Sequence, residues 1–276
     1  MANTVVAVDW AVARGANGVE IDLKFDEAGK PTEFRHGGIC DCFCAPGQNS
    51  ICSALAASGQ DSGASACGAS DAPARLLRHL SRKPGIGLVI VDSKVDDLSA
   101  VALAIAGRRA IQLVESDLFG AGYSGNLVIS VASMNSVEYL RAASQSVRGK
   151  HFAHRVFFSF DQEGNDAIPA LTKLRNLPSN ARAFGTGISA CWIGDFRKGI
   201  RVAESNRRRG AASFVYVWTL DSPTSMLRYL NAGAQGIITN YPGRLRSVID
   251  ANGYKLATQD AIFPPAINDP VAGFPE

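Results

Sequence analysis

Two acidic residues, Glu20 and Asp22, alternate with aliphatic residues in the stretch GVEIDLKF at residues 18–25. Successive side chains of a strand point to opposite faces, so the two carboxylates share one face and the aliphatic side chains share the other. Ionised carboxylates inside a protein repel each other and lose hydration, so they need a cation or a basic partner. The pattern predicts an inward-facing pair of cation ligands. The alternative is an edge strand whose acidic face lies in water.

A third carboxylate, Asp92, ends the apolar run GLVIVDSK, and Lys94 follows two residues later on the same side of the predicted strand. Ligands bind at the strand ends of parallel barrels, and Mg2+ prefers carboxylate and water oxygens. We therefore predict that Glu20, Asp22 and Asp92 hold Mg2+. The alternative for Asp92 is a helix N-cap or a loop position.

One histidine stands close in sequence to the first two carboxylates. Residues 26–30 predict a turn around Gly29, and the following TEFRH predicts a short returning strand that carries His36 back toward them. An imidazole placed there can exchange a proton with a phosphoester oxygen at neutral pH. The other three histidines are interpreted as structural or exposed.

Five of the six cysteines fall within 28 residues, and an even number at close spacing indicates disulfides in an oxidising compartment. The alternative is a zinc site, but C-x-C-x-C lacks the C-x2-C knuckle and no histidine pair follows it. The disulfide candidates are Cys40, Cys42, Cys44, Cys52, Cys67 and Cys191.

Two aromatic residues near the C-terminal end of the chain share a strand face. FVYVWTLD places Tyr216 and Trp218 on one side, and GIITNYP brings Asn240 to the end of the next apolar run. Aromatic rings at a strand's C-terminal end can form a wall for a quaternary ammonium group. The alternative is ordinary packing inside the core.

Short apolar runs alternate with helical segments along the whole chain, which predicts repeated βα units and a parallel sheet. No Gly-rich phosphate turn follows the first run, so the pattern favours an α/β (β/α)8 TIM barrel over a doubly wound sheet. The predicted strands are 18–25, 87–93, 126–133, 155–161, 182–189, 213–221 and 234–240. The predicted helices include 72–82, 136–149, 166–177, 195–210 and 223–233.

The strand count is one short of eight. The chain opens with a predicted helix that ends near Gly15, and no strand precedes it. A barrel without its first strand has two unpaired edges, so either the barrel closes with seven strands or its beginning is missing. Residues 1–260 are interpreted as one domain. Residues 37–74 form a long cysteine-containing loop at the C-terminal face of the barrel, and residues 261–276 form a Pro-rich tail.

The overall composition excludes some classes of protein. No run of about 18 apolar residues is present, which predicts no transmembrane segment. The formal charge of +3 is too small for a dedicated nucleic-acid binder. The segment MANTVVAVDWAVARGAN lacks the cationic start and compact apolar core of a signal peptide, although the cysteines indicate secretion.

An ordered set of motifs resembles the sphingomyelinase D/phospholipase D family of spider venoms and its bacterial and fungal relatives, which are similar to glycerophosphodiester phosphodiesterases. The similarity covers nearly the whole chain, and the first motif is the most specific. The motifs are GANGVEIDLKFDEAGKPTEFRHGGICDC, VDSK, FDQEGNDAI, VYVWTLD, GAQGIITNYP and YKLATQD.

The resemblance implies a role for each matching residue. It implies that Glu20, Asp22 and Asp92 hold Mg2+ and that His36 is one of two catalytic histidines. It implies that Asp41 orients the catalytic histidine and that Lys94 contacts the phosphate. The residues implied to line the site are Tyr216, Trp218, Asp221 and Asn240. The resemblance also implies a disulfide between Cys42 and Cys191, and a pairing of Cys40 within its own loop that leaves its partner open.

The resemblance further implies release of choline or another head group from sphingomyelin and lysophospholipids by attack of the substrate's own hydroxyl, which gives a cyclic phosphate. Such an enzyme would be a secreted monomer that acts peripherally at a membrane surface. The alternatives are a glycerophosphodiester phosphodiesterase and a catalytically impaired lipid-binding barrel.

One departure from the family favours the impaired form. The family's other catalytic histidine ends the first barrel strand and directly precedes a Met-x-Asn segment, whereas this chain begins with MAN. The hypothesis is that the full protein starts upstream and includes that strand and that histidine. We expect little turnover from the 276-residue form and metal-dependent turnover from an extended form.

Overall fold

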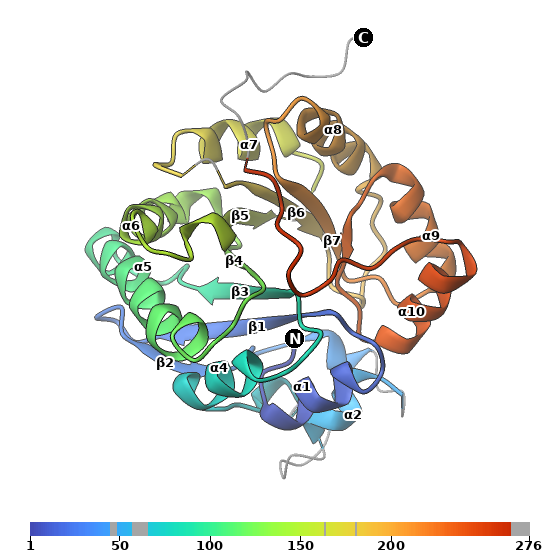
Figure 1. The fold of residues 1–276 in the computed structure, drawn as a ribbon, viewed down its shortest axis with the longest axis horizontal. Helices are drawn as coiled ribbons and strands as arrows, with labels where there is room; N and C mark the ends of the chain where they lie inside the picture. Colours follow the sequence, from blue (N-terminus) through green and yellow to red (C-terminus); the bar gives the residue numbers. More distant parts are fainter. Residues whose placement is uncertain (45–48, 57–65, 163, 180, 266–276) are drawn as a thin grey trace.

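The computed structural model describes residues 1–44, 49–56, 66–162, 164–179 and 181–265. In this part of the chain a curled sheet with the strand order β2-β1-β3-β4-β5-β6-β7-β8 lies inside a layer of helices (Figure 1). The strands are β1 (Gly18–Phe25), β2 (Pro31–Phe34), β3 (Leu88–Lys94), β4 (Asn126–Val131), β5 (Val156–Gln162), β6 (Ala183–Gly187), β7 (Phe214–Trp218) and β8 (Gly236–Ile237). All are parallel except β2, which forms an antiparallel hairpin with β1. The predicted α/β barrel architecture and its seven parallel strands are confirmed.

Helices cover the outer face of the sheet (Figure 1). They are α1 (Val5–Val12), α2 (Ile51–Ala56), α4 (Pro73–Ser81), α5 (Ala100–Val114), α6 (Val137–Val147), α7 (Ala167–Arg175), α8 (Arg197–Arg208), α9 (Pro223–Ala232) and α10 (Pro242–Ala251). The opening helix begins at an N-cap, Thr4, whose side chain accepts a hydrogen bond from the amide of Ala7. Among the described residues, no helix has both the length and the apolar character needed to cross a bilayer.

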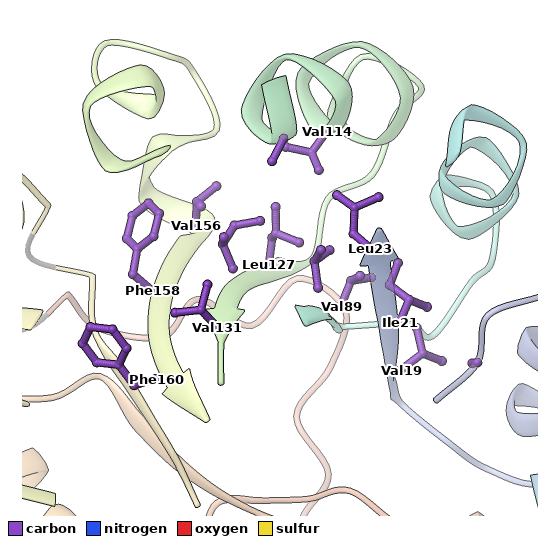
Figure 2. Close-up of a cluster of buried hydrophobic side chains, with 14 of the residues drawn as sticks. Val19, Ile21, Leu23, Val89, Val114, Leu127, Val131, Val156, Phe158 and Phe160 are labelled. Atoms are coloured by element: carbon purple, nitrogen blue, oxygen red, sulfur yellow. The ribbon is translucent and has the colours of Figure 1, made fainter. Parts of the chain in front are cut away.

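The alternation read from the sequence decides which face of β1 packs against helices. Figure 2 shows Val19, Ile21 and Leu23 on the side of the sheet that faces the helical layer, where Val114 of α5 approaches. These three β1 side chains are at most 7% exposed. A second apolar cluster, which includes Ile90, Val128, Phe157, Phe214 and Tyr216, fills part of the barrel interior. The acidic residues of β1 therefore point into the barrel, as predicted.

The loop between β2 and α4 contains a helix that the sequence did not indicate. Residues 37–74 are predicted to be irregular, but α2 forms within them. Ile51, Cys52 and Leu55 are buried there, and the amide of Ile51 donates to the carbonyl oxygen of Asn240. Tertiary packing and a disulfide thus fix a short helix whose own periodicity is too weak to predict it. Residues 45–48 and 57–65 of this loop lie outside the described residues.

The sheet is open between β1 and β8. Within the described residues no strand pairing joins them, and a cavity of about 710 Å³ lies between them, lined by Gly18 and Glu20 on one side and Gly236 and Ile237 on the other. The amide of Ala2 donates to the carbonyl oxygen of Glu20 at this edge. Strand β2 pairs with β1 only from Leu23 onward, so within the described residues the first part of β1 and the outer side of β8 have no strand partner, as the strand count led us to expect.

The start of the predicted Pro-rich tail packs against the barrel. The side-chain amide of Asn126 donates to the carbonyl oxygen of Ala261 at 2.6 Å. The ring of Phe263 lies 4.7 Å from that of Phe214 and 5.7 Å from that of Phe157. Residues 266–276 of the tail lie outside the described residues.

Candidate active site

Three carboxylates from two neighbouring strands converge inside the barrel. Strands β1 and β3 pair in parallel with Asp22 opposite Asp92, and one carboxylate oxygen from each of Glu20, Asp22 and Asp92 lies within 4.8 Å of the others. Asp22 is 1% exposed, whereas the other two are half-buried. We call these three residues the acidic triad. Their spacing brings together the oxygens that the sequence predicts as metal ligands.

The donor set of the acidic triad fits a hard divalent cation. All three residues offer carboxylate oxygens, which are the preferred ligands of Mg2+. Oδ1 of Asp92 is buried and has no hydrogen-bond partner in the described part of the chain. An unpartnered buried carboxylate oxygen is costly unless a ligand satisfies it. The residues present are therefore able to hold such an ion.

Lys94 provides the main positive charge beside the acidic triad. Its ammonium group lies 2.8 Å from Oδ1 of Asp22 and 2.5 Å from Oδ2 of Asp92. Burial acts to lower the pKa of Lys94, but the neighbouring carboxylates outweigh it and raise that pKa. Lys94 therefore stays charged and can bind a phosphate oxygen as well as its present partners.

The pKa values of the two β1 carboxylates are shifted in opposite directions. Burial acts to raise the pKa of Asp22, but the charge of Lys94 outweighs it and lowers that pKa. Burial, together with repulsion from Asp22, raises the pKa of Glu20 to about 8. The α-amino group of Met1 lies 2.9 Å from Oε2 of Glu20. Asp22 is thus the more readily ionised member of the pair.

Asn3 orients Asp22, and sequence reasoning missed it. Its side-chain amide donates to Oδ2 of Asp22 at 2.6 Å, while its Oδ1 accepts a hydrogen bond from the amide of Asp22 at 2.7 Å. The side chain of Asn3 is 1% exposed. Asn3 is the asparagine of the Met-x-Asn segment, but the segment alone does not give it a role, because the contact depends on the position of β1 in the folded sheet.

The hairpin carries His36 toward the acidic triad. Strand β2 ends at Phe34, so His36 lies two residues beyond the strand and not within it, which corrects the sequence prediction. The amide of Arg35 donates to the carbonyl oxygen of Asp22 and holds the returning chain beside β1. Nδ1 of His36 lies 2.7 Å from the carbonyl oxygen of Gly37. A carbonyl only accepts, so Nδ1 carries a proton, and Nε2 is the ring nitrogen left for another partner.

The carboxylate of Asp41 is hydrogen-bonded to the loop after β6 and to Asn240. Its Oδ1 accepts from Oγ of Ser189 at 2.6 Å and from the amide of Ala190 at 3.0 Å. Its Oδ2 accepts from the side-chain amide of Asn240 at 3.3 Å. Among the described residues no hydrogen bond joins Asp41 to His36. Asp41 therefore links the cysteine loop to the loop after β6.

Asp221 and Asn240 form a second linked pair at the end of β8. The side-chain amide of Asn240 donates to Oδ2 of Asp221 at 3.0 Å, and its backbone amide donates to Oδ1 at 2.9 Å. Thr239 also donates to Asp221, at 3.1 Å. The predicted site residues Asp41, Asp221 and Asn240 are thus joined in one hydrogen-bonded chain.

The two aromatic residues predicted as a site wall differ in exposure. Tyr216 is 1% exposed, stacks on Phe214 and donates its hydroxyl proton to Asp161, so it belongs to the barrel interior. Trp218 is half-buried, and its Nε1 has no hydrogen-bond partner among the described residues. Of the two rings, only Trp218 has the partial exposure that a ligand wall needs.

Asp161 on β5 is a further interior carboxylate that sequence reasoning missed. It accepts hydrogen bonds from the hydroxyl groups of Tyr216 and Ser159. Burial, followed by repulsion from Asp92, raises its pKa to about 7. Its position at the end of an apolar run in RVFFSFD repeats that of Asp92, and this signal was sufficient to find it.

All six cysteines form disulfides, which excludes the zinc alternative because no thiolate remains as a ligand. Cys40 pairs with Cys67 inside its own loop, as predicted. The predicted pairing of Cys42 with Cys191 is wrong, since Cys42 pairs with Cys52 and Cys44 pairs with Cys191. The helical turn η1 (Asp41–Phe43) leaves the buried Cys42 beside α2, and Cys44 ends that turn next to the loop after β6.

Comparison with solved structures places this architecture in a known class of barrel. An Oleispira antarctica phosphodiesterase in complex with sn-glycerol-3-phosphate is 13% identical, with a TM-score of 0.56 over 90% of this chain and 92% of that chain. A putative glycerophosphoryl diester phosphodiesterase from Silicibacter pomeroyi is 14% identical, with a TM-score of 0.63 over 92% of this chain and 90% of that chain. The protein therefore has the barrel fold of these phosphodiesterases.

The sequence comparison is more specific than the fold. The family described as "Dermonecrotic toxin SPH" matches residues 1–56 and 77–263, so the chain belongs to this family. Dermonecrotic toxin LarSicTox-betaID1 of Loxosceles arizonica is 26% identical over 94% of this chain and 89% of its own. Dermonecrotic toxin Hl-PLD1 of Hemiscorpius lepturus is 28% identical over 91% of this chain and 76% of its own. The family resemblance stated from the motifs is confirmed.

Proposed function

We propose that the protein is a Mg2+-dependent phospholipase D/sphingomyelinase D type phosphodiesterase that releases the choline head group from sphingomyelin and lysophospholipids. The observation that carries the proposal is the acidic triad with Lys94 between two of its members and His36 on the adjoining hairpin. Anionic ligands, a cation for phosphate and an acid/base group are the parts that phosphodiester cleavage needs. Membership of the dermonecrotic toxin family supports the choice of a phospholipid substrate.

Glu20, Asp22 and Asp92 would hold Mg2+, and the unpartnered Oδ1 of Asp92 supports this assignment. The ion, when bound, supplies Lewis-acid stabilisation of negative charge on phosphate oxygens. Lys94 binds a non-bridging phosphate oxygen. Asn3 holds the carboxylate of Asp22 in one orientation through its two hydrogen bonds.

His36 carries the proton transfer in this proposal. The attacking hydroxyl of the substrate forms a new P–O bond and loses its proton to Nε2 of His36, the ring nitrogen left for the substrate because Nδ1 donates to the carbonyl oxygen of Gly37. The P–O bond to choline breaks, and choline leaves as an alcohol after it takes a proton from a second donor. The product is a cyclic phosphate, so the reaction is a transphosphatidylation in which water is not consumed.

Trp218 is the proposed contact for the choline group. An indole ring is the strongest aromatic partner for a quaternary ammonium ion. Trp218 is half-buried on β7, and Asp221 follows three residues later. A ring and a carboxylate at one end of the sheet suit a permanent cation that cannot donate a hydrogen bond.

One observation supports a catalytically impaired, lipid-binding barrel as an alternative function. Within the described residues His36 is the one imidazole beside the acidic triad, because His79 is paired with Asp9, His151 packs edge-on against Phe152 and His154 is exposed. The second proton donor is therefore not an imidazole of the described chain. An impaired, lipid-binding barrel is the second candidate function, and it predicts binding with little turnover.

The three disulfides fit a secreted protein, and we extend the proposal to a monomer that acts peripherally at a membrane surface. Disulfides are stable in oxidising compartments, and a phospholipid substrate is presented by a membrane or a micelle.

Phosphorus NMR of the reaction products tests the proposed function. Sphingomyelin, lysophosphatidylcholine and glycerophosphocholine are each incubated with the protein in Mg2+ and in EDTA. We expect a cyclic phosphate from the first two substrates in Mg2+ only. Turnover of glycerophosphocholine alone would contradict the proposal in favour of a glycerophosphodiester phosphodiesterase. Binding of sphingomyelin without turnover would identify the impaired barrel.

A further inference from the structure

Four large apolar side chains stand exposed on two loops near the site. Ile39 is 79% exposed and Phe43 is 51% exposed in the cysteine loop, and Trp192 is 71% and Ile193 fully exposed in the loop after β6. Singly exposed apolar residues are ordinary, but a group of them on adjoining loops marks an interaction surface.

The two loops are fixed to each other. The disulfide between Cys44 and Cys191 holds their Cα atoms 5.3 Å apart, and each cysteine directly adjoins an exposed aromatic residue, Phe43 or Trp192. Asp41 adds a second link through its hydrogen bonds to Ser189 and Ala190. Neighbours in sequence are about 3.8 Å apart at Cα, so the two aromatic residues lie close together across the disulfide. The four exposed residues therefore lie on two loops that are covalently joined beside Phe43 and Trp192, and we call them the ridge.

We propose that this ridge, made of Ile39, Phe43, Trp192 and Ile193, inserts into the interfacial region of a phospholipid layer and docks the protein on it. These side chains suit a phospholipid layer, because Trp and Phe prefer the boundary between head groups and acyl chains, and aliphatic side chains enter the acyl region. The inference deepens the proposed function, since a phospholipid layer is the source of the proposed substrate.

Hydrogen bonds connect the ridge to the candidate active site, and this connection favours a lipid layer over a protein as the partner. Asp41 accepts a hydrogen bond from Ser189 in the loop after β6, which carries Trp192 and Ile193. It also accepts a hydrogen bond from the side-chain amide of Asn240, which donates to Asp221 as well. Insertion of the ridge would therefore set the depth of the head-group site relative to the lipid surface. A clamped pair of loops keeps that depth constant, because the disulfide prevents the loops from separating.

Vesicle binding measures the ridge directly. Sphingomyelin–phosphatidylcholine vesicles are sedimented with wild-type protein, with a Trp192→Ser/Ile193→Ser double variant and with Val101→Ser. Val101 is 72% exposed on α5 and serves as the matched control. We expect the double variant to bind at least about tenfold more weakly, because two interfacial side chains are lost, and the control to bind as the wild type does. Phe43→Ser, on the other loop, should also weaken binding.

Turnover of a water-soluble short-chain lysophospholipid below its micelle concentration separates docking from catalysis. Trp192 and Ile193 are exposed and are not among the proposed catalytic residues, so the double variant should keep wild-type turnover of this substrate. Equal vesicle binding by the wild type and the ridge variants would overturn the proposal, as would a wild type that does not bind vesicles. If the wild type binds vesicles through the ridge but turns over no substrate, the proposed function fails and the docking surface stands.

Discussion

At the scale of single residues, Asp22 shows how strand alternation becomes chemistry. Its side chain must point inward because its neighbours Ile21 and Leu23 pack against helices. Once inside, it meets Lys94 and Asn3, and these contacts keep it ionised and oriented. Sequence pattern alone predicts the inward direction. The partners come from the strand pairing and from the chain before α1, and the alternation in β1 does not identify them.

Local sequence patterns do not identify partners that are distant in sequence, and this explains which site residues sequence reasoning missed or misplaced. Asp161 lies on β5 and receives its hydrogen bond from Tyr216 on β7, 55 residues away in sequence. Asp41 has partners 148 and 149 residues away. Such contacts depend on the curvature of the whole sheet, so motifs identify the residue types without identifying their partners.

The role of His36 is tested by replacing it with alanine. We expect His36→Ala to lower kcat on sphingomyelin by about 10²- to 10⁴-fold, because a general base is removed. Circular dichroism and the unfolding midpoint should stay near wild type, since the ring is half-buried and, within the described part of the chain, its one hydrogen bond is to the adjacent Gly37. His154→Ala, an exposed histidine in η4 (Ala153–Arg155), is the control and should keep full turnover. Unchanged kcat in His36→Ala would remove this residue from the mechanism.

The raised pKa of Asp161 predicts a specific dependence of stability on pH. Burial and repulsion from Asp92 raise its pKa from an ordinary value of 3.8 to about 7, so the folded state binds more protons than the unfolded state between these values. Its contribution to stability is therefore complete below pH 3.8 and is lost as pH rises to about 7. The slope is about 1.4 kcal/mol for each pH unit.

Urea unfolding from pH 4 to pH 7 in EDTA measures this contribution as the difference between wild type and Asp161→Asn. We expect the variant to lose the downward slope, because asparagine does not ionise and still accepts from Tyr216. Asp195→Asn is the control, since hydrogen bonds from Arg197 hold the pKa of Asp195 to about 2, below the tested range. A wild type and an Asp161→Asn variant with parallel profiles would show that Asp161 is not protonated in this range.

At the scale of elements, the strands were predictable and the cysteine loop was not. Each barrel strand is a short apolar run between a helix and a turn, so local pattern is enough to locate it. The loop contains α2, which depends on the burial of Ile51 and Leu55 and on the bond between Cys42 and Cys52. Six cysteines permit 15 pairings, and sequence spacing does not choose among them.

The disulfides differ in how much of the chain each one closes. The bond from Cys44 to Cys191 spans 147 residues, and the bond from Cys42 to Cys52 spans 10. Breaking the disulfide that closes the longer loop gives the unfolded chain more conformational entropy. Cys44→Ser/Cys191→Ser should therefore lose about 2 kcal/mol more free energy of unfolding than Cys42→Ser/Cys52→Ser. Urea denaturation of the two double variants measures the difference. Equal losses would show that native packing of α2, and not chain entropy, decides the stability of this region.

At the scale of the whole molecule, repeated βα units predicted the barrel and the strand count predicted its open side. The packing of the C-terminal tail on the barrel was not predictable, because Phe263 contacts Phe157 and Phe214 only in the curled sheet. Function also depends on this scale, since the acidic triad comes from β1 and β3 whereas Trp218 and Asn240 come from the last two strand ends. The open side lies between these two halves of the site.

Hydrogen exchange tests whether the sheet is open in solution. β4 has a paired neighbour on each side and every residue buried, whereas β8 pairs only with β7 and its two residues are half-buried. We expect the amides of β4 to exchange only through global unfolding, so their rates should rise steeply with added urea. The amides of β8 should exchange faster through local opening and respond weakly to urea. Mass spectrometry of exchanged peptides measures both, with β3 as an internal control that should follow β4. Equal protection of β8 and β4 would mean that the edges of β1 and β8 are covered in solution and that the two halves of the site are joined.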